Sequence, residues 1–440
     1  TGDLADVLLP ATGWGEKDGT VTNSERRISR QRAFLPAPGQ ARPDWQIICE
    51  VAARMGWKDA FNFATPADVF AEYIASAAAT MTFGRDLDLS IFADADYAEL
   101  VPTQWPRNDM RFFADGKFYH PDGKARMLPI SAPAPRTKDV FTLNTGRNRD
   151  QWHTMTRSGK APRLGAHLAE PYVEIHPKDA ADLSVSPDDL VELLGPNGKS
   201  VVRALITERT AKGQLFTPMH WTRQQSSAGW VNALAAPVVD PVSGQPASKT
   251  NKVTARKFAA TWFGYAVSSM PIRADGDYAA VARTRTGWQA EFAGLHTPEN
   301  WEGFARTVMD VEGCTMSQVL GRDGRYGRLA FHDGDHLTGV LFSSPSPVSL
   351  SRSYAGSLIG TSVPALRALA GRSGADQPYP GATICACLNI GVNTLRSAIS
   401  AGANSVDALG AATCAGTNCG SCKPELARLI EDMRQPEIAQ

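Results

Sequence analysis

Cysteine is the residue whose distribution along this chain most clearly indicates chemistry. Five of the seven cysteines fall within the last 60 of 440 residues. Cys385 and Cys387 form a C-x-C pair, and Cys419 and Cys422 form a C-x-x-C pair. Two close pairs can place four thiolates around one centre. Four sulfur ligands suit zinc as well as iron, so the spacing leaves open an iron–sulfur cluster, a structural zinc site and a set of unpaired structural cysteines.

The residues around the two pairs fit an anionic centre. Gly416 and Gly420 let the backbone approach the sulfurs, and Pro424 suits the first turn of a helix. That helix would direct its unpaired N–H groups toward the centre, which raises the potential of an iron–sulfur cluster. Cys414 lies outside the four-ligand pattern, and we expect a thiol beside the cluster or a free thiol.

The segment TGRNRDQWHT, residues 145–154, is the second candidate site. Thr145 and Gly146 place a hydroxyl and a glycine at a turn. Arg147 can donate two parallel hydrogen bonds to a phosphate, and Trp152 and His153 can pack against a ring system and donate to it. The alternative is a barrel strand with a surface arginine and a packed tryptophan.

These candidates must be positioned by elements of different kinds. Residues 1–60 contain an apolar opening, TGDLADVLLP, expected as a loop running into a buried strand, and a helix over PDWQIICEVAARMG. Residues 137–258 show short strands separated by Gly and Pro turns, including a hairpin across GPNG, which favours a closed barrel over a parallel sheet. Residues 381–440 read as short helices. We therefore predict four parts, with boundaries 1–136, 137–258, 259–380 and 381–440, the third of unclear role beyond one hairpin, YGRLAFH to LTGVLF.

Composition limits the function classes. Hydrophobic residues make up 43% and charged residues 20%, as in ordinary soluble proteins. Lys plus Arg equals Asp plus Glu, 45 each, so we expect neither a nucleic-acid nor a membrane partner. An odd number of cysteines argues against a disulfide framework and indicates a reducing, cytoplasmic compartment. The chain lacks an initiator Met and a signal-peptide pattern, so we expect it to begin inside a larger protein.

Three stretches resemble known families. Residues 383–430, TICACLNIGVNTLRSAISAGA to GTNCGSCKPELARLI, resemble the bacterioferritin-associated-ferredoxin (BFD) type of [2Fe-2S] domain, which implies Cys385, Cys387, Cys419 and Cys422 as ligands. ADVLLPATGWGEKDGTVTNSERR, residues 5–27, resembles a signature of molybdopterin oxidoreductases. The stretch from LNTGRNRDQWHTMTRSGKAPRL through PMHW to VDPVSGQPASK resembles their dinucleotide-binding domain. The combination is similar to the assimilatory nitrate reductases of bacteria.

The resemblance implies a fold and a set of cofactor contacts. The fold is a mixed α/β and β fragment with a double-psi-type β-barrel and a small helical [2Fe-2S] domain at the C-terminus. The cofactor is molybdenum bis(molybdopterin guanine dinucleotide). Its implied contacts are Lys17, Asp44, Thr145, Gly146, Arg147, Gln151, Trp152, His153, Thr154, Asn232 and Lys249.

Each implied contact has a plainer alternative. Lys17 and Lys249 can be solvated lysines, and Asn232 a turn residue. Asp44 can accept hydrogen bonds from the amino edge of guanine, or cap a helix beginning at Trp45. His167 and His176 are predicted on the barrel surface rather than as ligands, and His220, in PMHW, aligns loosely with the substrate funnel of the family.

The resemblance also implies an activity, namely reduction of nitrate to nitrite. Electrons would come from a flavoprotein reductase, a ferredoxin or a flavodoxin, and would enter through the [2Fe-2S] cluster. The family's [4Fe-4S] motif, its molybdenum ligand and its first dinucleotide-binding half are expected upstream of Thr1. Catalytic residues are therefore unknown within this chain, and we expect it to be inactive alone. A formate dehydrogenase and a non-catalytic electron-transfer module are the alternatives.

Overall fold

The structure is a computed structural model that describes residues 2–80, 88–106, 113–118, 120–129, 140–241, 243–246, 248–322, 324–374 and 379–434. The chain divides into two compact units, Thr1–Pro133 and Ala134–Gln440. Every candidate site residue named above lies in the described ranges. No helix among these described residues is both long and apolar enough to cross a bilayer.

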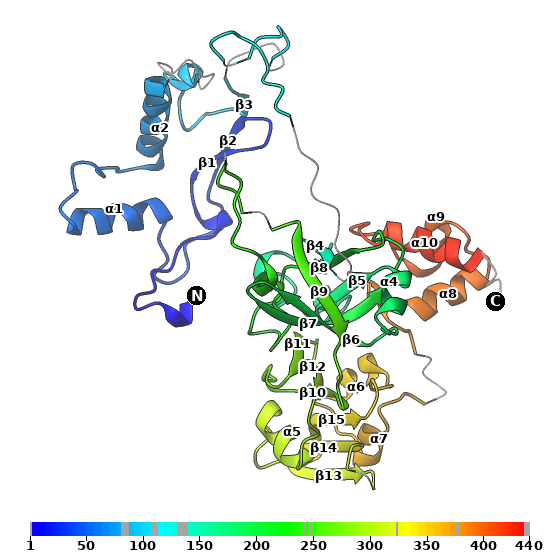
Figure 1. Cartoon of the computed structure of the whole chain (residues 1–440). Coiled ribbons are helices and arrows are strands. Elements are labelled where there is room, and N and C mark those ends of the chain that lie inside the picture. Colours follow the sequence, from blue (N-terminus) through cyan, green and yellow to red (C-terminus); the bar gives the residue numbers. More distant parts are fainter. Residues whose placement is uncertain are drawn as a thin grey trace. The chain divides into compact units, whose positions relative to one another are not determined.

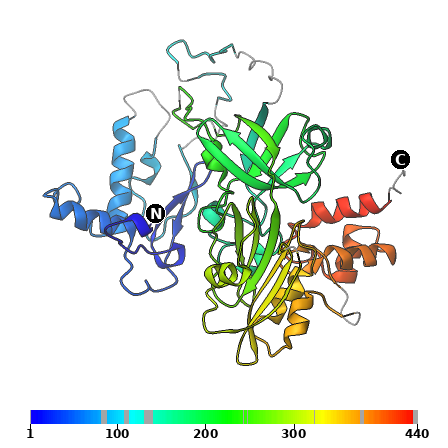
Figure 2. The ribbon, with the colours of Figure 1, turned by 60° about the horizontal axis from the view of Figure 1, so that its bottom comes forward.

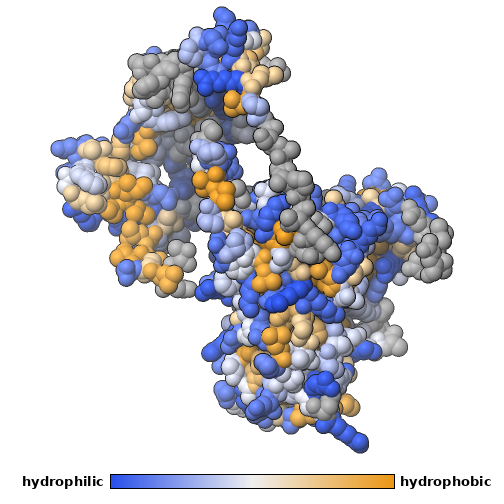
Figure 3. All heavy atoms as spheres, viewed as in Figure 1, coloured by the Kyte–Doolittle hydropathy of each residue, from blue (hydrophilic) through white to orange (hydrophobic). Residues whose placement is uncertain are grey.

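The first unit combines a three-stranded sheet with two helices. The strands β1 (Gly19–Thr22), β2 (Arg27–Gln31) and β3 (Thr103–Gln104) form an antiparallel sheet in that order. The helices are α1 (Asp44–Arg54) and α2 (Pro66–Thr80). Side chains from the sheet, α2 and the following loops form the core, including Ile28, Phe70 and Trp105. On α1, Ile48 and Val51 are exposed, and Figure 3 shows an apolar surface over this helix.

The opening of this unit differs from the prediction. Residues 5–10 form no strand, and Val7, Leu8 and Leu9 are exposed rather than buried. Only the next residue, Ala11, forms a bridge, and its partner is Arg42. Apolar sequence alone predicted burial here, but the first unit supplies no neighbouring strand that would cover these side chains.

The second unit begins with a closed six-stranded barrel (Figures 1 and 2). The strands run in the order β4 (Phe141–Gly146), β8 (Gln214–Pro218), β5 (Tyr172–Ile175), β7 (Gly198–Ile206), β6 (Leu190–Gly195) and β9 (Asn251–Lys257). The pairs β4–β8 and β5–β7 are parallel, and the others are antiparallel. Gly195 pairs with Gly198 across the predicted turn. The fold-class prediction, a closed barrel within a mixed α/β chain, is confirmed.

A six-stranded antiparallel sheet follows the barrel. Its order is β11 (Tyr278–Arg283), β12 (Trp288–Gly294), β10 (Trp262–Ser268), β15 (His336–Ser344), β14 (Gly327–Asp333) and β13 (Thr315–Leu320). Successive residues of β10 face opposite sides, as strand geometry requires. Ala266 packs in the core beneath α5 (Trp301–Met309), whereas Tyr265 and Val267 pack in the core with α6 (Arg352–Leu358) and α7 (Ala365–Ala370). The predicted hairpin is β14–β15, closed by Asp333 opposite His336.

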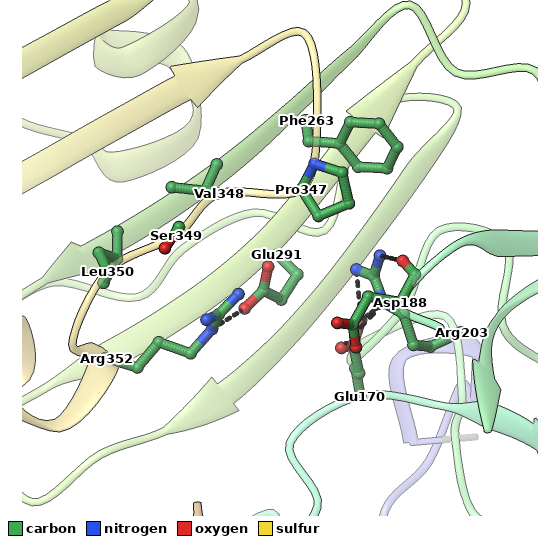
Figure 4. Close-up of a pocket in the computed structure, with 10 residues that line it drawn as sticks. All are labelled: Glu170, Asp188, Arg203, Phe263, Glu291, Pro347, Val348, Ser349, Leu350 and Arg352. Carbon is green, nitrogen blue, oxygen red and sulfur yellow. Dashed lines mark hydrogen bonds and ion pairs between the residues drawn. The ribbon is translucent and has the colours of Figure 1, made fainter. Parts of the chain in front are cut away.

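A hydrogen bond from Tyr278 to Glu170 joins the barrel to this sheet, beside one ion pair on each side. Arg203 of β7 binds Glu170 through Nε at 3.1 Å and Nη2 at 2.9 Å, and Tyr278 of β11 donates to the same carboxylate at 2.6 Å. Arg352 of α6 binds Glu291 of β12 at 2.5 Å. Figure 4 shows both pairs lining a cavity of about 350 Å³. Each charged group at this junction therefore has a partner of opposite charge within the protein, as poorly hydrated charges require.

The tail domain, residues 383–434, completes the second unit. It contains β16 (Thr383–Cys385), β17 (Ile390–Gly391), α8 (Val392–Ser400), α9 (Val406–Thr413) and α10 (Lys423–Arg434). Leu395, Leu409, Leu426 and Ile430 form its core with two of the cysteines. In both ribbon views these helices, orange to red, lie beside the barrel (Figures 1 and 2).

Candidate metal and cofactor sites

The sulfurs of the two predicted cysteine pairs form a row of neighbours. The Sγ atoms of Cys385 and Cys387 are 3.7 Å apart, and those of Cys387 and Cys419 are also 3.7 Å apart. Cys422 makes a hydrogen-bond contact with Cys385 at the other end of the row. Strand β16 with its following turn supplies one pair, and the loop before α10 supplies the other. The fold thus unites residues more than thirty positions apart, as the spacing predicted.

The surroundings of the four thiols favour ionisation at two of them. Burial raises the pKa of Cys385, but hydrogen bonds from the backbone N–H groups of Gly416 and Leu388 outweigh burial and lower it below its usual value. The hydroxyl of Ser421, 3.1 Å away, lowers the pKa of Cys419. Burial raises the pKa of Cys387, and that of Cys422 to about 11. Bound metal would deprotonate these two thiols as well.

The donor set is compatible with a two-iron cluster. A row of four sulfurs allows each of two irons to take two thiolates. Cys385 and Cys422 are buried, whereas Cys419 is exposed, so one side of such a cluster faces the protein and the other faces solvent. Cys414 is an exposed free thiol that ends α9 in a left-handed conformation.

The barrel segment 145–154 begins at the end of β4. Thr145 is buried, and its hydroxyl donates to the carbonyl of Ser248 at 3.1 Å. The ammonium of Lys249 donates to the carbonyl of Thr145, so the two ends of the predicted cofactor surface meet here. Gly146 lies against the ring of Phe216, where an added Cβ would approach to 2.7 Å. Only glycine fits between this strand end and that ring.

An exposed aromatic and cationic group follows. The guanidinium of Arg147 lies 4.6 Å from the ring of Trp152, and that of Arg157 lies 5.4 Å from it. The ring of His153 packs edge-on against Trp152 at 4.7 Å. Thr154 has a positive φ of 49°, and non-glycine residues in this region gather at functional sites. An exposed tryptophan flanked by two arginines can receive a planar, anionic ligand.

A buried polar network, missed by sequence reasoning, fixes the turn between these groups. The hydroxyl of Tyr172 donates to the side-chain oxygen of Asn148 at 2.7 Å, and the amide of Asn148 donates to Gln151 at 3.2 Å. The backbone N–H of Asn148 donates to Nε2 of His220 at 3.2 Å. Burial lowers the pKa of His220, so its ring is neutral and can accept.

One nitrogen in this network, Nε2 of Gln151, has no hydrogen-bond partner. Buried polar groups are normally satisfied, so an unpaired donor of this kind indicates a place for a ligand or water. Gln151 is one of the predicted cofactor contacts, and its unpaired donor therefore supports the fit of this surface to a polar cofactor. Asn232 is exposed on the short helix η6 (Val231–Leu234), and among the described residues no hydrogen bond or ion pair joins it to the other candidates.

In the first unit, Lys17 and Asp44 form an ion pair of 2.8 Å, and Lys17 also lies 5.7 Å from the ring of Trp14. The hydrogen bond from Lys17 lowers the pKa of Asp44. Asp44 is the first residue of α1, and the N-cap position of this helix is occupied by Pro43. The helix-cap alternative for Asp44 is therefore wrong, because the helix begins one residue earlier than expected.

Sequence reasoning also missed a charged cluster where the barrel meets the tail domain. Arg149 and Asp150, inside the candidate segment, contact His167 and Glu425. His167 does lie at the barrel surface, as predicted, but its side chain is only 13% exposed because α10 covers it. His176 caps α4 (Pro177–Asp182) by accepting a hydrogen bond from the N–H of Lys178.

Comparison with protein families assigns three stretches of the chain. Residues 1–54 match the molybdopterin oxidoreductase family, residues 141–252 match the molydopterin dinucleotide binding domain, and residues 383–432 match the BFD-like [2Fe-2S] binding domain. The third match contains all four cysteines of the sulfur row. The second contains the segment 145–154 together with Asn232 and Lys249.

Individual relatives are similar to this chain over different lengths. A nitrate reductase from Klebsiella oxytoca is 37% identical over 98% of this chain and 51% of its own length. The assimilatory nitrate reductase catalytic subunit of Bacillus subtilis is 32% identical over 57% of this chain and 35% of its own length. The alpha subunit of an F420-dependent formate dehydrogenase from Methanocaldococcus jannaschii is 33% identical over 50% of this chain and 33% of its own length. The chain thus spans about half the length of its Klebsiella relative.

Proposed function

By its matched domains the chain belongs to the molybdopterin oxidoreductases, and we propose that it forms the C-terminal part of a molybdenum-dependent assimilatory nitrate reductase. The observation that carries this proposal is the similarity to a nitrate reductase over 98% of the chain, tail domain included. The formate dehydrogenase relative aligns with only half of the chain. Nitrate is therefore the favoured substrate, and formate the second candidate.

Within this function the barrel and the first unit would hold the guanine dinucleotide cofactor. Arg147 would bind phosphate, Trp152 would pack against a ring, and the unpaired nitrogen of Gln151 would donate at its polar edge. Gly146, Thr145, His153, Thr154, Asn232 and Lys249 would complete the barrel surface. Lys17 and Asp44, which lie in the first unit, are proposed as separate cofactor contacts. The bound molybdenum would supply oxygen-atom transfer from nitrate, chemistry that belongs to the cofactor rather than to the protein.

The tail domain would carry electrons. Its [2Fe-2S] cluster, held by Cys385, Cys387, Cys419 and Cys422, would accept them from a flavoprotein reductase, a ferredoxin or a flavodoxin. A [4Fe-4S] centre in the upstream part would relay them toward molybdenum. The parts with boundaries 1–136, 137–258, 259–380 and 381–440 would be cofactor core, dinucleotide barrel, connecting sheet and electron-transfer module.

Substrate choice is tested with the full-length enzyme. Reduced viologen would be supplied with nitrate, and oxidised viologen with formate, at matched molybdenum content. We expect nitrite formation and no formate oxidation. The 440-residue chain alone should show neither activity. Formate oxidation without nitrite formation would identify the enzyme as a formate dehydrogenase.

A further inference from the structure

One cluster of charged side chains connects the barrel to the tail domain. Arg149 and Asp150 follow β4, His167 follows the short helix α3 (Pro162–Gly165), and Glu425 lies in the first turn of α10. Nη1 of Arg149 lies 2.9 Å from a carboxylate oxygen of Glu425, and Nε lies 2.9 Å from Asp150. The two ring nitrogens of His167 lie 3.3 Å from Asp150 and 3.5 Å from the same oxygen of Glu425.

Arg149 holds the tail domain at a second point. Its Nη2 donates to the carbonyl of Ile384 at 2.6 Å. Ile384 directly precedes Cys385, and Glu425 follows Cys422 by three residues. One guanidinium therefore contacts the chain beside a ligand of each cysteine pair. The fork geometry of arginine suits such a divided contact, which a lysine could not make.

The barrel side of the cluster is shielded from water, and the cluster is electrically balanced. The side chains of Arg149, Asp150 and His167 are 18%, 11% and 13% exposed, whereas that of Glu425 is 34% exposed. Burial lowers the pKa of His167, but its contacts to Asp150 and Glu425 outweigh burial and raise the pKa above its usual value. Burial raises the pKa of Asp150 and of Glu425, but their cationic partners lower both overall. Two cations thus face two anions, and shielded charges of this kind persist only when paired.

The position of the cluster links the two candidate sites. Arg149 and Asp150 belong to the cofactor segment 145–154, and the charge of Arg149 also acts on the thiol of Cys422, opposing the effect of burial on its pKa. Cys422 and Cys385 are the buried sulfurs, while Cys419 is the exposed one. The protein-facing side of the sulfur row therefore lies toward the barrel segment, and the solvent-facing side remains available to an electron donor.

We infer that Arg149 is a positioning residue that docks the [2Fe-2S] domain onto the cofactor-binding segment of the barrel. The groups that it contacts on the [2Fe-2S] domain are the carboxylate of Glu425 and the carbonyl of Ile384. Docking fixes the buried side of the cluster toward the molybdenum cofactor and leaves the Cys419 side for the donor. The electron-transfer consequence rests on the proposed function, whereas the docking contact itself does not.

Docking is measured by amide hydrogen exchange on the 440-residue chain. Arg149→Gln and Glu425→Gln should each accelerate exchange about tenfold in residues 383–391 and in the first turn of α10, a factor equivalent to ~1.4 kcal/mol. The double variant should exchange less than the product of the two single accelerations predicts, because the Arg149–Glu425 contact is lost in both single variants. Arg163→Gln and Glu431→Gln are matched controls, since both residues are exposed, and should leave exchange unchanged. Unchanged exchange in both test variants, or an acceleration in the double variant that equals this product, would overturn the docking contact.

The midpoint potential of the cluster, followed by electron paramagnetic resonance during a redox titration, gives a second readout. Loss of the positive charge in Arg149→Gln should lower the potential, because that charge favours the more negative, reduced cluster. In Arg149→Lys the midpoint potential should stay close to that of the unsubstituted chain, because the positive charge is retained. Protection from exchange should still be lost, because lysine lacks the forked guanidinium that makes the divided contact. An unchanged potential in Arg149→Gln would contradict the placement of Arg149 beside the cluster. Absence of any [2Fe-2S] signal in the unsubstituted chain would instead refute the proposed function and leave the exchange result standing.

Discussion

At the scale of single residues, we expect each of the four cysteines in the row to be necessary for the cluster. Replacing Cys385, Cys387, Cys419 or Cys422 with Ser should abolish the [2Fe-2S] cluster, because each supplies one of four thiolates. Cys414→Ser is the matched control and should retain the cluster, because Cys414 caps α9 outside the row. Iron, acid-labile sulfide and zinc per chain give the readout. One zinc per chain in a colourless protein would reject the iron–sulfur assignment.

For the barrel, the corresponding prediction concerns Arg147 and the binding of the cofactor. Arg147→Ala removes a cation that lies over Trp152 and is free to bind phosphate. A hydrogen bond to a charged group contributes ~1.5–3 kcal/mol, so cofactor occupancy of the full-length enzyme should fall while its fold persists. Lys17→Ala should have a smaller effect, because lysine acts as a single point charge. Molybdenum analysis and circular dichroism measure both properties, and unchanged molybdenum in both variants would place these residues outside the cofactor surface.

The environment of His167 leads us to expect that the stability of the docked chain depends on pH. Its pKa is raised by Asp150 and Glu425 despite burial and the nearby charge of Arg149. A histidine whose pKa is raised by folding stabilises the folded state. The full stabilisation is present at pH values below the ordinary pKa, about 6.5, and it is lost as the pH rises through the folded-state pKa. The melting temperature of the chain should therefore exceed that of His167→Gln most at acidic pH, and the difference should shrink as pH rises. A difference that stays constant across this range would show that His167 does not titrate within the cluster.

From the sequence, spacing could indicate which cysteines lie together, although the metal that they would bind stays a prediction. Cys385 and Cys419 could be paired in advance because ligand spacing is local and the domain is small. The network of Asn148, Tyr172 and His220 could not, because its partners are brought together only when the barrel closes. Arg149 was hidden for the same reason, since its partner Glu425 belongs to another domain.

At the scale of elements, the junction between barrel and sheet depends on buried charge. Removing one partner of a buried ion pair costs about 3–5 kcal/mol, because the other charge is left uncompensated. Arg203→Met should therefore lower the free energy of unfolding by that order. Lys212→Met should have little effect, because Lys212 and its partner Asp182 are 54% and 71% exposed. Denaturant unfolding of the chain measures both, and equal stability of the two variants would show that the Glu170–Arg203 pair does not stabilise this part of the fold.

Turn chemistry explains which elements the sequence revealed. The hairpins β6–β7 and β14–β15 were predicted from Gly195–Gly198 and from Gly334, where glycine or asparagine permits a tight turn. Helix α2 was not predicted, although Ala-rich sequence favours a helix, because its surroundings read as an irregular stretch. The pairing of β4 with β8 joins strands far apart in sequence, and no local pattern specifies such partners.

At the scale of the whole molecule, we propose separate tasks for barrel and tail. The barrel would hold the cofactor, and the tail would pass electrons to it across the Arg149 contact. The tail has its own core around Leu395, Leu409 and Leu426, so its removal should leave the barrel core intact. Family resemblance supplied this division of labour from sequence, but the docked position of the tail required the folded chain.

Deletion of residues 381–440 from the full-length enzyme tests the central claim most directly. Nitrate reduction would be assayed with reduced viologen, which can reach other centres, and with the physiological flavoprotein or ferredoxin donor. The account predicts unchanged molybdenum content, retained activity with viologen and a strong loss of activity with the physiological donor. Full activity with both donors would contradict it, because electrons would then enter without the tail cluster. Loss of both activities in a folded, molybdenum-loaded enzyme would equally contradict it, because the tail would then do more than carry electrons.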